Sequence, residues 1–121
     1  GHAKDYVEAM WKMMQKKDAS DYVIATGRQY YVKEFVDMVL KELGIKYVWK
    51  GKGIDSKCYD INGKCIVQCD KKYFRPLEVN TLVGDSSKAR KELNWKPKIS
   101  IKNLIKEMIR NEIEILKDDR P

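Results

Sequence analysis

Hydrophobic positions along the chain change their spacing several times, and each change marks an expected element. In residues 3–17 the apolar positions recur every three or four residues, which predicts an amphipathic helix. Its apolar stripe comprises Ala3, Tyr6, Val7, Met10, Met13 and Met14. The β-branched and aromatic run Tyr22–Thr26 stops at Gly27 and predicts a buried strand.

The next stretch continues the alternation of helix and strand. A second apolar stripe predicts a helix that ends at Gly44, a residue suited to the left-handed conformation that closes a helix. That stripe comprises Val32, Phe35, Val36, Val39, Leu40 and Leu43. Ile45–Trp49 then predicts a strand. The order strand, helix, strand over residues 22–49 favours a right-handed parallel crossover.

Turn and capping residues organise the second half of the chain. Asn62-Gly63 separates residues 57–61 from residues 64–69 and predicts a two-residue hairpin turn. Asp85 is placed to cap a short helix, Asn94 to end it in a left-handed conformation, and Ser100 to cap a long amphipathic last helix. The predicted fold class is α/β, a small mixed sheet with helices packed on it, in a single domain over residues 1–121.

The length and composition of the chain fit one folded domain. It has 121 residues and a mass of 14.2 kDa, and its 43% of apolar residues exclude a disordered chain. No apolar run approaches the ~20 residues of a membrane span, and the N-terminus lacks a signal-peptide layout, so we expect a cytoplasmic protein with no membrane partner. The first helix begins directly after Gly1-His2, which suggests a chain cut from a longer one.

Charge and cysteine content narrow the possible partners. The 25 basic residues exceed the 18 acidic ones, giving a formal net charge of +7. This excess favours an anionic partner, and charge alone leaves open a nucleic acid, an acidic surface or a phosphorylated small molecule. The three cysteines, Cys58, Cys65 and Cys69, are an odd number, which predicts reduced, buried thiols. Their spacing matches no four-ligand zinc pattern, so no metal is expected.

A search for catalytic residues ends without a complete active site. The single histidine, His2, lies at the end of the chain, where we expect no catalytic role. Gly51–Ser56 comes nearest to a phosphate-binding loop but lacks a third glycine and a strand-to-helix setting. None of the seven tyrosines has a lysine four residues later, so the Tyr-x-x-x-Lys pairing that activates a catalytic tyrosine is missing. We therefore expect no catalytic, cofactor-binding or metal-binding residue on this chain.

One short segment, Tyr73–Asn80, combines groups suited to a nucleotide. Pro76 fixes its own backbone and favours an extended conformation of Arg75. The guanidinium of Arg75 matches two phosphate oxygens, and each such charge-assisted bond contributes about 1.5 to 3 kcal/mol. Glu78, further along the segment, can accept hydrogen bonds from two vicinal hydroxyls, as on a ribose. A surface salt bridge between Arg75 and Glu78 explains the same pattern, and the residues alone leave both interpretations open.

Several segments of the chain occur, in the same order and spacing, in a known family. They are Gly1–Trp11, Asp21–Gly27, Arg75–Val79, Gly84–Ala89 and Trp95–Pro97. In these segments the chain resembles the C-terminal part of the GDP-mannose 4,6-dehydratases, members of the extended short-chain dehydrogenase group.

The resemblance implies a parent enzyme that removes water from GDP-mannose to give GDP-4-keto-6-deoxymannose, with an NADP that takes a hydride from C4 and returns it at C6. It implies that the catalytic residues and NADP belong to an N-terminal dinucleotide-binding part absent here, on which helix 3–17 would pack. It also implies that Arg75 contacts the diphosphate and Glu78 the ribose. This chain would then be a substrate-binding domain, inactive alone, without a cofactor of its own and with weak affinity for GDP-mannose or GDP. The parent is expected to be a homo-oligomer.

Departures from the family pattern keep other functions open. Asn80 replaces a usual Asp, Tyr31 replaces a Ser that often caps the second helix, and Asn94 replaces a Gly. The first two leave room for a related nucleotide-sugar dehydratase or epimerase. Lysines and aromatic residues alternate over Lys46–Lys52, as in a basic nucleic-acid-binding module, but the chain has no motif of that kind and no nucleic-acid partner is expected. An exposed apolar stripe on helix 3–17 would also suit a protein that only mediates assembly.

Overall fold

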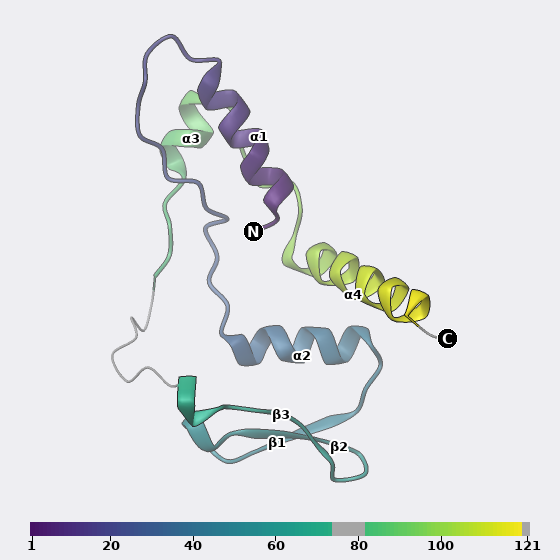
Figure 1. Cartoon of the computed structure of the whole chain (residues 1–121). Coiled ribbons are helices and arrows are strands. Elements are labelled where there is room, and N and C mark those ends of the chain that lie inside the picture. The colour runs from purple at the N-terminus through teal and green to yellow at the C-terminus, as the bar shows by residue number, and fades with distance from the viewer. Residues whose placement is uncertain (74–81, 120–121) are drawn as a thin grey trace. The chain divides into compact units, whose positions relative to one another are not determined.

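The computed structural model describes residues 1–73 and 82–119 (Figure 1). These residues form the helices α1 (Ala3–Met14), α2 (Val32–Glu42), α3 (Ser87–Glu92) and α4 (Ile101–Asp118), the strands β1 (Tyr47–Lys50), β2 (Lys57–Asp60) and β3 (Cys65–Gln68), and the short 3-10 helices η1 (Gly53–Asp55) and η2 (Lys71–Tyr73). The chain divides into two compact units. We call Gly1–Tyr31 with Thr81–Pro121 the helical unit and Val32–Asn80 the sheet unit.

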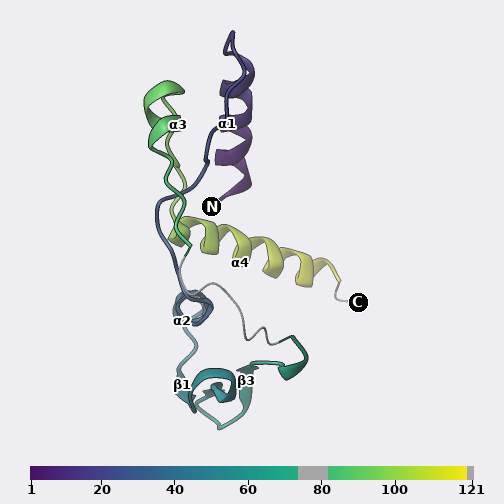
Figure 2. The ribbon, with the colours of Figure 1, turned by 90° about the vertical axis from the view of Figure 1, so that its left-hand side faces the viewer.

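The core of the helical unit lies where α1 and α3 run side by side (Figure 2). Ala9 of α1 and Ala89 of α3 are fully buried, and their small side chains allow the two helices to approach closely. Trp95 fills the space beside them and is only 1% exposed. The cluster is completed by Leu93 and surrounded by Tyr6, Met13, Tyr22 and Ile24.

The ends of the helices in this unit follow local capping chemistry. The first predicted helix is confirmed as α1, which ends at Met14 and not at Lys17. Asn94 has a φ of 53° and turns the chain after α3, as predicted. The N–H of Asn103 donates a hydrogen bond to Oγ of Ser100 at 3.2 Å, which confirms the predicted cap of α4.

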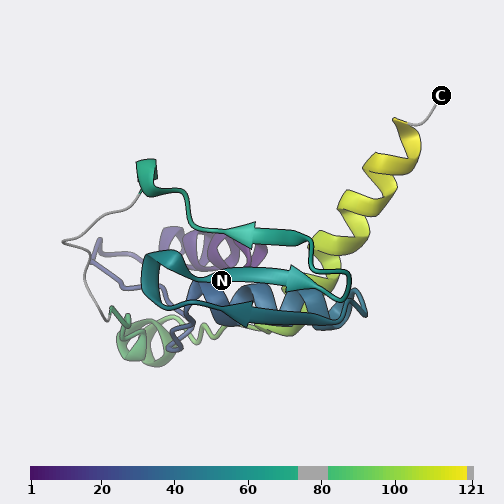
Figure 3. The ribbon, with the colours of Figure 1, turned by 90° about the horizontal axis from the view of Figure 1, so that it is seen from below.

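The sheet unit is a three-stranded antiparallel sheet with α2 against one face (Figure 3). Its strand order is β1-β2-β3. Nε1 of Trp49 on β1 donates a hydrogen bond to Oδ1 of Asp37 on α2 at 2.7 Å, and Cys58 on β2 is fully buried. Gly44, with a φ of 71°, follows α2 in the predicted left-handed conformation.

The predicted hairpin between β2 and β3 is confirmed, with a longer turn. The N–H of Asp60 donates to the carbonyl of Lys64 at 2.9 Å, and the N–H of Gly63 donates to the carbonyl of Asp60 at 3.1 Å. Residues 61–63 therefore form the connection, one more than the two-residue turn predicted from Asn62-Gly63. Gly63 has a φ of 80°, a conformation that glycine adopts without strain.

Two expectations about strands are wrong. Tyr22–Thr26 carries no secondary structure, and every strand pair within residues 1–73 and 82–119 is antiparallel, so the parallel crossover predicted over residues 22–49 does not form. A strand needs a neighbouring strand, and the described part of the chain offers Tyr22–Thr26 none. The α/β fold class is confirmed, because helices and a small sheet occur in the same chain.

Candidate functional site

The predicted substrate-binding residues, Arg75 and Glu78, lie outside the described residues. Their positions are therefore not compared with the prediction, and their role stays a prediction. The structure describes the chain on either side of them, up to Tyr73 and from Leu82 onwards.

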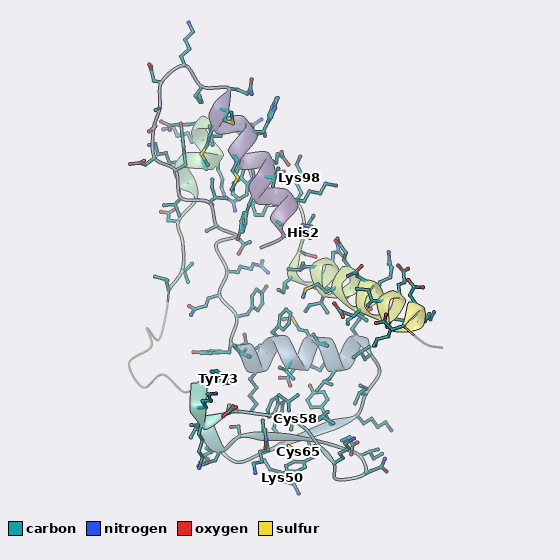
Figure 4. All side chains as sticks on the ribbon, viewed as in Figure 1. His2, Lys50, Cys58, Cys65, Tyr73 and Lys98 are labelled. Carbon is teal, nitrogen blue, oxygen red and sulfur yellow. The ribbon has the colours of Figure 1, made fainter. Side chains whose placement is uncertain are left out.

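Short-range hydrogen bonds fix the chain on both sides of residues 74–81. Before them, Oδ1 of Asp70 accepts from the N–H of Lys72 at 2.9 Å, and its carbonyl accepts from the N–H of Tyr73 at 3.0 Å. Tyr73 ends η2 and is 71% exposed (Figure 4). After them, Asp85 accepts from the hydroxyl and the backbone N–H of Ser87, and these bonds lower the pKa of its carboxyl. The described chain thus ends in a hydrogen-bonded turn before residue 74 and contains another hydrogen-bonded turn at residues 85–87.

Asp5 joins the first turn of α1 to the segment after Trp95. Its side chain is buried, and Oδ2 accepts from the N–H groups of Lys98 at 3.1 Å and Ile99 at 3.0 Å. The carbonyl of Asp5 accepts from Nε1 of Trp95 at 2.8 Å. Sequence analysis did not single out Asp5. The sequence offered one signal, which is that Asp5 directly precedes Tyr6, a residue of the predicted apolar stripe. A carboxylate beside such a stripe needs hydrogen-bond donors, because carboxylates are rarely buried without them.

A charged cluster lies beside this contact. Nζ of Lys98 and Nζ of Lys12 lie 3.0 Å and 3.4 Å from Oε1 of Glu8. The hydrogen bond from Lys98 is the main cause that lowers the pKa of Glu8, and Lys12 adds to it. Lys12 also donates to the carbonyl of Asn94 at 2.9 Å, so the same cation stabilises the turn after α3.

His2 is held at both ring nitrogens. Nδ1 accepts from the N–H of Lys4 at 3.0 Å and so caps α1, while Nε2 lies 2.9 Å from Oε2 of Glu107 on α4 (Figure 4). Its position is therefore more fixed than its place at the end of the chain suggested. An open depression of about 330 Å³ lies beside it. Its lining includes Glu107, Glu114 and Arg110, and the excess of carboxylates disfavours a diphosphate ligand there.

The three cysteines differ in exposure. Cys58 is buried as predicted, and burial, with Asp37 nearby, raises the pKa of its thiol. Cys65 and Cys69 are exposed, so the prediction of buried thiols is wrong for these two, because β3 is an edge strand and Cys69 follows its end. Within residues 1–73 and 82–119, no three His, Cys, Asp or Glu side chains gather in a way that could hold a metal ion.

The lysine-rich stretch that suggested a nucleic-acid partner lies in the sheet unit. Nζ of Lys33 lies 4.8 Å from the ring centroid of Trp49, and Nζ of Lys50 lies 5.5 Å from that of Tyr59. One face of each ring is therefore covered by an ammonium of the same chain. A base stacks on a single ring face. The nucleic-acid alternative therefore stays a prediction that these two contacts do not decide.

A large apolar surface lies on the side of α1 that faces away from the core. It comprises Val7, Met10, Trp11 and Met14, which are 60%, 59%, 62% and 82% exposed. We call these four residues the outer face of α1. The expected exposed stripe is thus confirmed, with Trp11 as a member that the sequence analysis missed and with Tyr6 and Met13 turned towards the core instead. An exposed apolar patch of this kind is typical of interaction surfaces, so packing of this face on another part of the enzyme stays a prediction.

The described residues place one limit on membrane contact. Across residues 1–73 and 82–119, no helix combines the length and the apolar character that crossing a bilayer requires.

Comparison with known proteins identifies the family. A family model described as GDP-mannose 4,6 dehydratase matches residues 1–108. Over 119 residues, the chain is 49% identical to the GDP-mannose 4,6 dehydratase of Drosophila melanogaster, 45% identical to the GDP-mannose 4,6 dehydratase 2 of Caenorhabditis elegans and 44% identical to the GDP-mannose 4,6 dehydratase of Homo sapiens. These alignments cover 97%, 98% and 97% of this chain and 30%, 31% and 32% of the relatives.

The chain belongs to the GDP-mannose 4,6-dehydratase family, which confirms the resemblance seen in the sequence. It spans about a third of the length of the curated relatives it matches. The matched part includes α1, the sheet unit and the Trp95–Pro97 segment.

Proposed function

We propose that this chain is the GDP-sugar-binding part of a GDP-mannose 4,6-dehydratase, an enzyme that converts GDP-mannose to GDP-4-keto-6-deoxymannose, and that it is inactive alone. The observation that carries the proposal is the family match over residues 1–108, which includes Arg75 and Glu78. The proposal of inactivity is supported by the sequence, which holds no complete active site, and by the greater length of the relatives.

Arg75 and Glu78 are proposed to hold the nucleotide. The guanidinium of Arg75 would donate to two diphosphate oxygens, a geometry that lysine does not reproduce. Glu78 would accept hydrogen bonds from the two ribose hydroxyls. The net charge of +7 supports an anionic ligand, because a positive field raises its local concentration.

NADP is proposed to act in the whole enzyme, where it accepts a hydride from the sugar and returns it. The described residues of this chain do not fit this cofactor. Gly51–Ser56, the nearest sequence to a phosphate-binding loop, connects the antiparallel strands β1 and β2 through η1. A dinucleotide loop instead joins a strand to a helix N-terminus, whose free N–H groups bind the pyrophosphate. We therefore assign NADP to residues of the enzyme that this chain does not contain.

The outer face of α1 is proposed to pack against that remaining part of the enzyme. Burial of a large apolar side chain contributes about 1.5 to 3 kcal/mol, so the four side chains of this face would give a stable contact. The exposure of these four side chains supports the prediction made from the sequence for helix 3–17.

A chimera tests the binding residues in an active context. The chain replaces the 119 matched residues of the Drosophila relative, and GDP-mannose turnover and affinity are measured. We expect Arg75→Ala to weaken GDP-mannose binding roughly 10- to 100-fold, as loss of charge-assisted bonds predicts, and Glu78→Gln to weaken it less. Arg110→Ala, a change at an exposed arginine of α4, is the matched control and should leave binding unchanged.

Two results would count against the proposal. A chimera that binds GDP-mannose equally well with Arg75→Ala would remove the assigned role of Arg75. Turnover of GDP-mannose by the isolated chain would contradict its inactivity. For the isolated chain, calorimetry should detect millimolar affinity for GDP or GDP-mannose, or none.

A further inference from the structure

Lysines gather at one end of the antiparallel sheet. Because neighbouring strands run in opposite directions, the end of β1, the start of β2 and the end of β3 meet there (Figure 3). Residues 50–57 and 68–73 belong to this end, and they hold five lysines and two aspartates, an excess of three positive charges. The opposite end, residues 45–46 and 60–64, holds two lysines and one aspartate. We call the first set the basic end of the sheet, and its charged residues are Lys50, Lys52, Asp55, Lys57, Asp70, Lys71 and Lys72.

Two of these lysines lie directly opposite each other. Lys50 on β1 pairs with Lys57 on β2, and both are exposed. They share the sheet face that points away from α2, because side chains alternate along a strand and the neighbouring Trp49 donates to Asp37 of α2. Like charges directly opposite each other destabilise a sheet. In the part of the chain that the structure describes, no carboxylate forms an ion pair with either ammonium. The packing of the sheet therefore does not explain this pair.

The contacts of the basic end leave its positive charge uncompensated. Nζ of Lys50 lies 5.5 Å from the ring centroid of Tyr59, and Nζ of Lys72 lies 5.6 Å from that of Tyr73. Aromatic rings carry no net charge, so these contacts hold the ammonium groups without neutralising them. Asp70 uses Oδ1 to accept from the backbone N–H of Lys72 at 2.9 Å. A net positive field therefore extends from this end of the sheet.

The basic end leads directly into the predicted binding segment. Lys71 and Lys72 form η2 together with Tyr73, the last described residue before position 74. Arg75 follows Lys72 by three residues in the sequence, and three residues of chain span at most about 11 Å in any conformation. Salt screens charge interactions over about 10 Å at an ionic strength of 0.1 M. The nearest lysines are therefore close enough to act on an anion held by Arg75.

We propose that the basic end of the sheet is an electrostatic guide, which raises the local concentration of the anionic GDP-sugar around Arg75 without contacting it. This inference rests on the proposed function, because it takes the diphosphate bound at Arg75 as the attracted group. A patch of one charge beside a site concentrates substrate of the opposite charge and speeds its association. The lysines gather where the binding segment begins, and this placement favours a compact anion over the extended backbone of a nucleic acid.

The salt dependence of binding tests the guide. Calorimetry measures the affinity of the chimera described above for GDP at ionic strengths from about 0.05 to 1 M. Three double variants each remove two positive charges, one near Arg75, one further along the basic end and one at the opposite end as the matched control. They are Lys71→Gln with Lys72→Gln, Lys50→Gln with Lys57→Gln, and Lys46→Gln with Lys64→Gln.

The expected losses follow the distance from Arg75. At about 0.1 M ionic strength, the first variant should weaken GDP binding roughly tenfold, the second roughly threefold and the control less than about twofold. The control lysines lie about one strand length further away, about 13 Å for four residues, which exceeds the screening length. At about 1 M the screening length falls to about 3 Å, and all four affinities should converge.

A neutral ligand and the thermal midpoint provide two controls. Guanosine lacks the diphosphate, so its affinity should be the same in every variant. Weaker guanosine binding in a lysine variant would show that the lysine acts through contact or structure and would overturn the inference. Lys50→Gln with Lys57→Gln should unfold at no lower temperature than the unmodified chimera, because it removes a like-charged pair. A lower midpoint would contradict the repulsion on which the inference depends.

The outcomes separate this inference from its rivals. Equal GDP affinities in all variants at about 0.1 M, or differences that persist at about 1 M, would overturn it. Unchanged GDP affinity with weaker retention on a single-stranded DNA column would assign the lysines to a nucleic acid and overturn it too. Salt-dependent losses in a chimera whose binding ignores Arg75→Ala would support the guide and refute the binding role of Arg75. A chimera that depends on Arg75 but not on the lysines would do the reverse.

Discussion

Replacement of Asp5 by alanine should destabilise the helical unit strongly. Asp5 is 2% exposed, and Oδ2 accepts two backbone hydrogen bonds, from the N–H groups of Lys98 and Ile99. Hydrogen bonds to a charged group contribute about 1.5 to 3 kcal/mol each, and two bonds to one oxygen are not fully additive. Alanine also leaves both donors without a partner at the base of α4. We expect Asp5→Ala to lower the free energy of unfolding by about 3 kcal/mol.

Two matched variants isolate the contribution of the charge. Asp5→Asn keeps an oxygen that can accept both bonds, so it should lower the free energy of unfolding by only about 1 kcal/mol. Asp18→Ala removes an exposed carboxylate and should change it by less than about 0.5 kcal/mol. Urea unfolding followed by far-UV circular dichroism measures all three. If Asp5→Ala stays within about 0.5 kcal/mol of the unmodified chain, or if Asp5→Asn is equally destabilising, the reasoning is wrong.

Three further predictions follow from the described contacts. The pKa of Glu8 is lowered in the folded state, chiefly by the hydrogen bond from Lys98, so the contribution of Glu8 to stability is present above its ordinary pKa of 4.5 and is lost as the pH falls through the lowered value. The thermal midpoint should therefore fall less on acidification in Glu8→Gln than in the unmodified chain. Parallel curves of thermal midpoint against pH would contradict this. A thiol reagent should modify the two exposed cysteines of the native chain rapidly and Cys58 only after unfolding, and rapid native labelling of Cys58 would show that it is not buried. Ser100→Ala should lower the free energy of unfolding by about 1 kcal/mol, because α4 loses its N-terminal cap. Ser100→Asp keeps a capping oxygen and should retain most of that stability. An unchanged urea midpoint in Ser100→Ala would argue against the cap.

The sequence by itself determined the elements whose causes are local. The helical periods of α1, α2 and α4, the Ser100 cap and the left-handed residues Gly44 and Asn94 all depend on neighbouring residues, and the structure confirms each of them. The hairpin was also local, apart from one extra residue in its turn. The family could be named from short segments in register, because those segments lie in the part that matches the relatives.

Only the tertiary structure decided which predicted segments pair or pack with another part of the chain. The composition of Tyr22–Thr26 predicts a strand, but a ladder needs hydrogen bonds to a second backbone, and within the described residues this segment forms none. The roles of Asp5 and Trp95 likewise depend on residues about ninety positions apart, a separation that no periodicity reveals. The orientation of α1 could not be predicted from its sequence either. This helix carries apolar residues on two sides, and only contacts with the rest of the unit determine which side faces the core. The propensity of a segment to form a helix or a turn depends on neighbouring residues. The burial of its side chains and the pairing of its strands depend on contacts between residues far apart in the sequence.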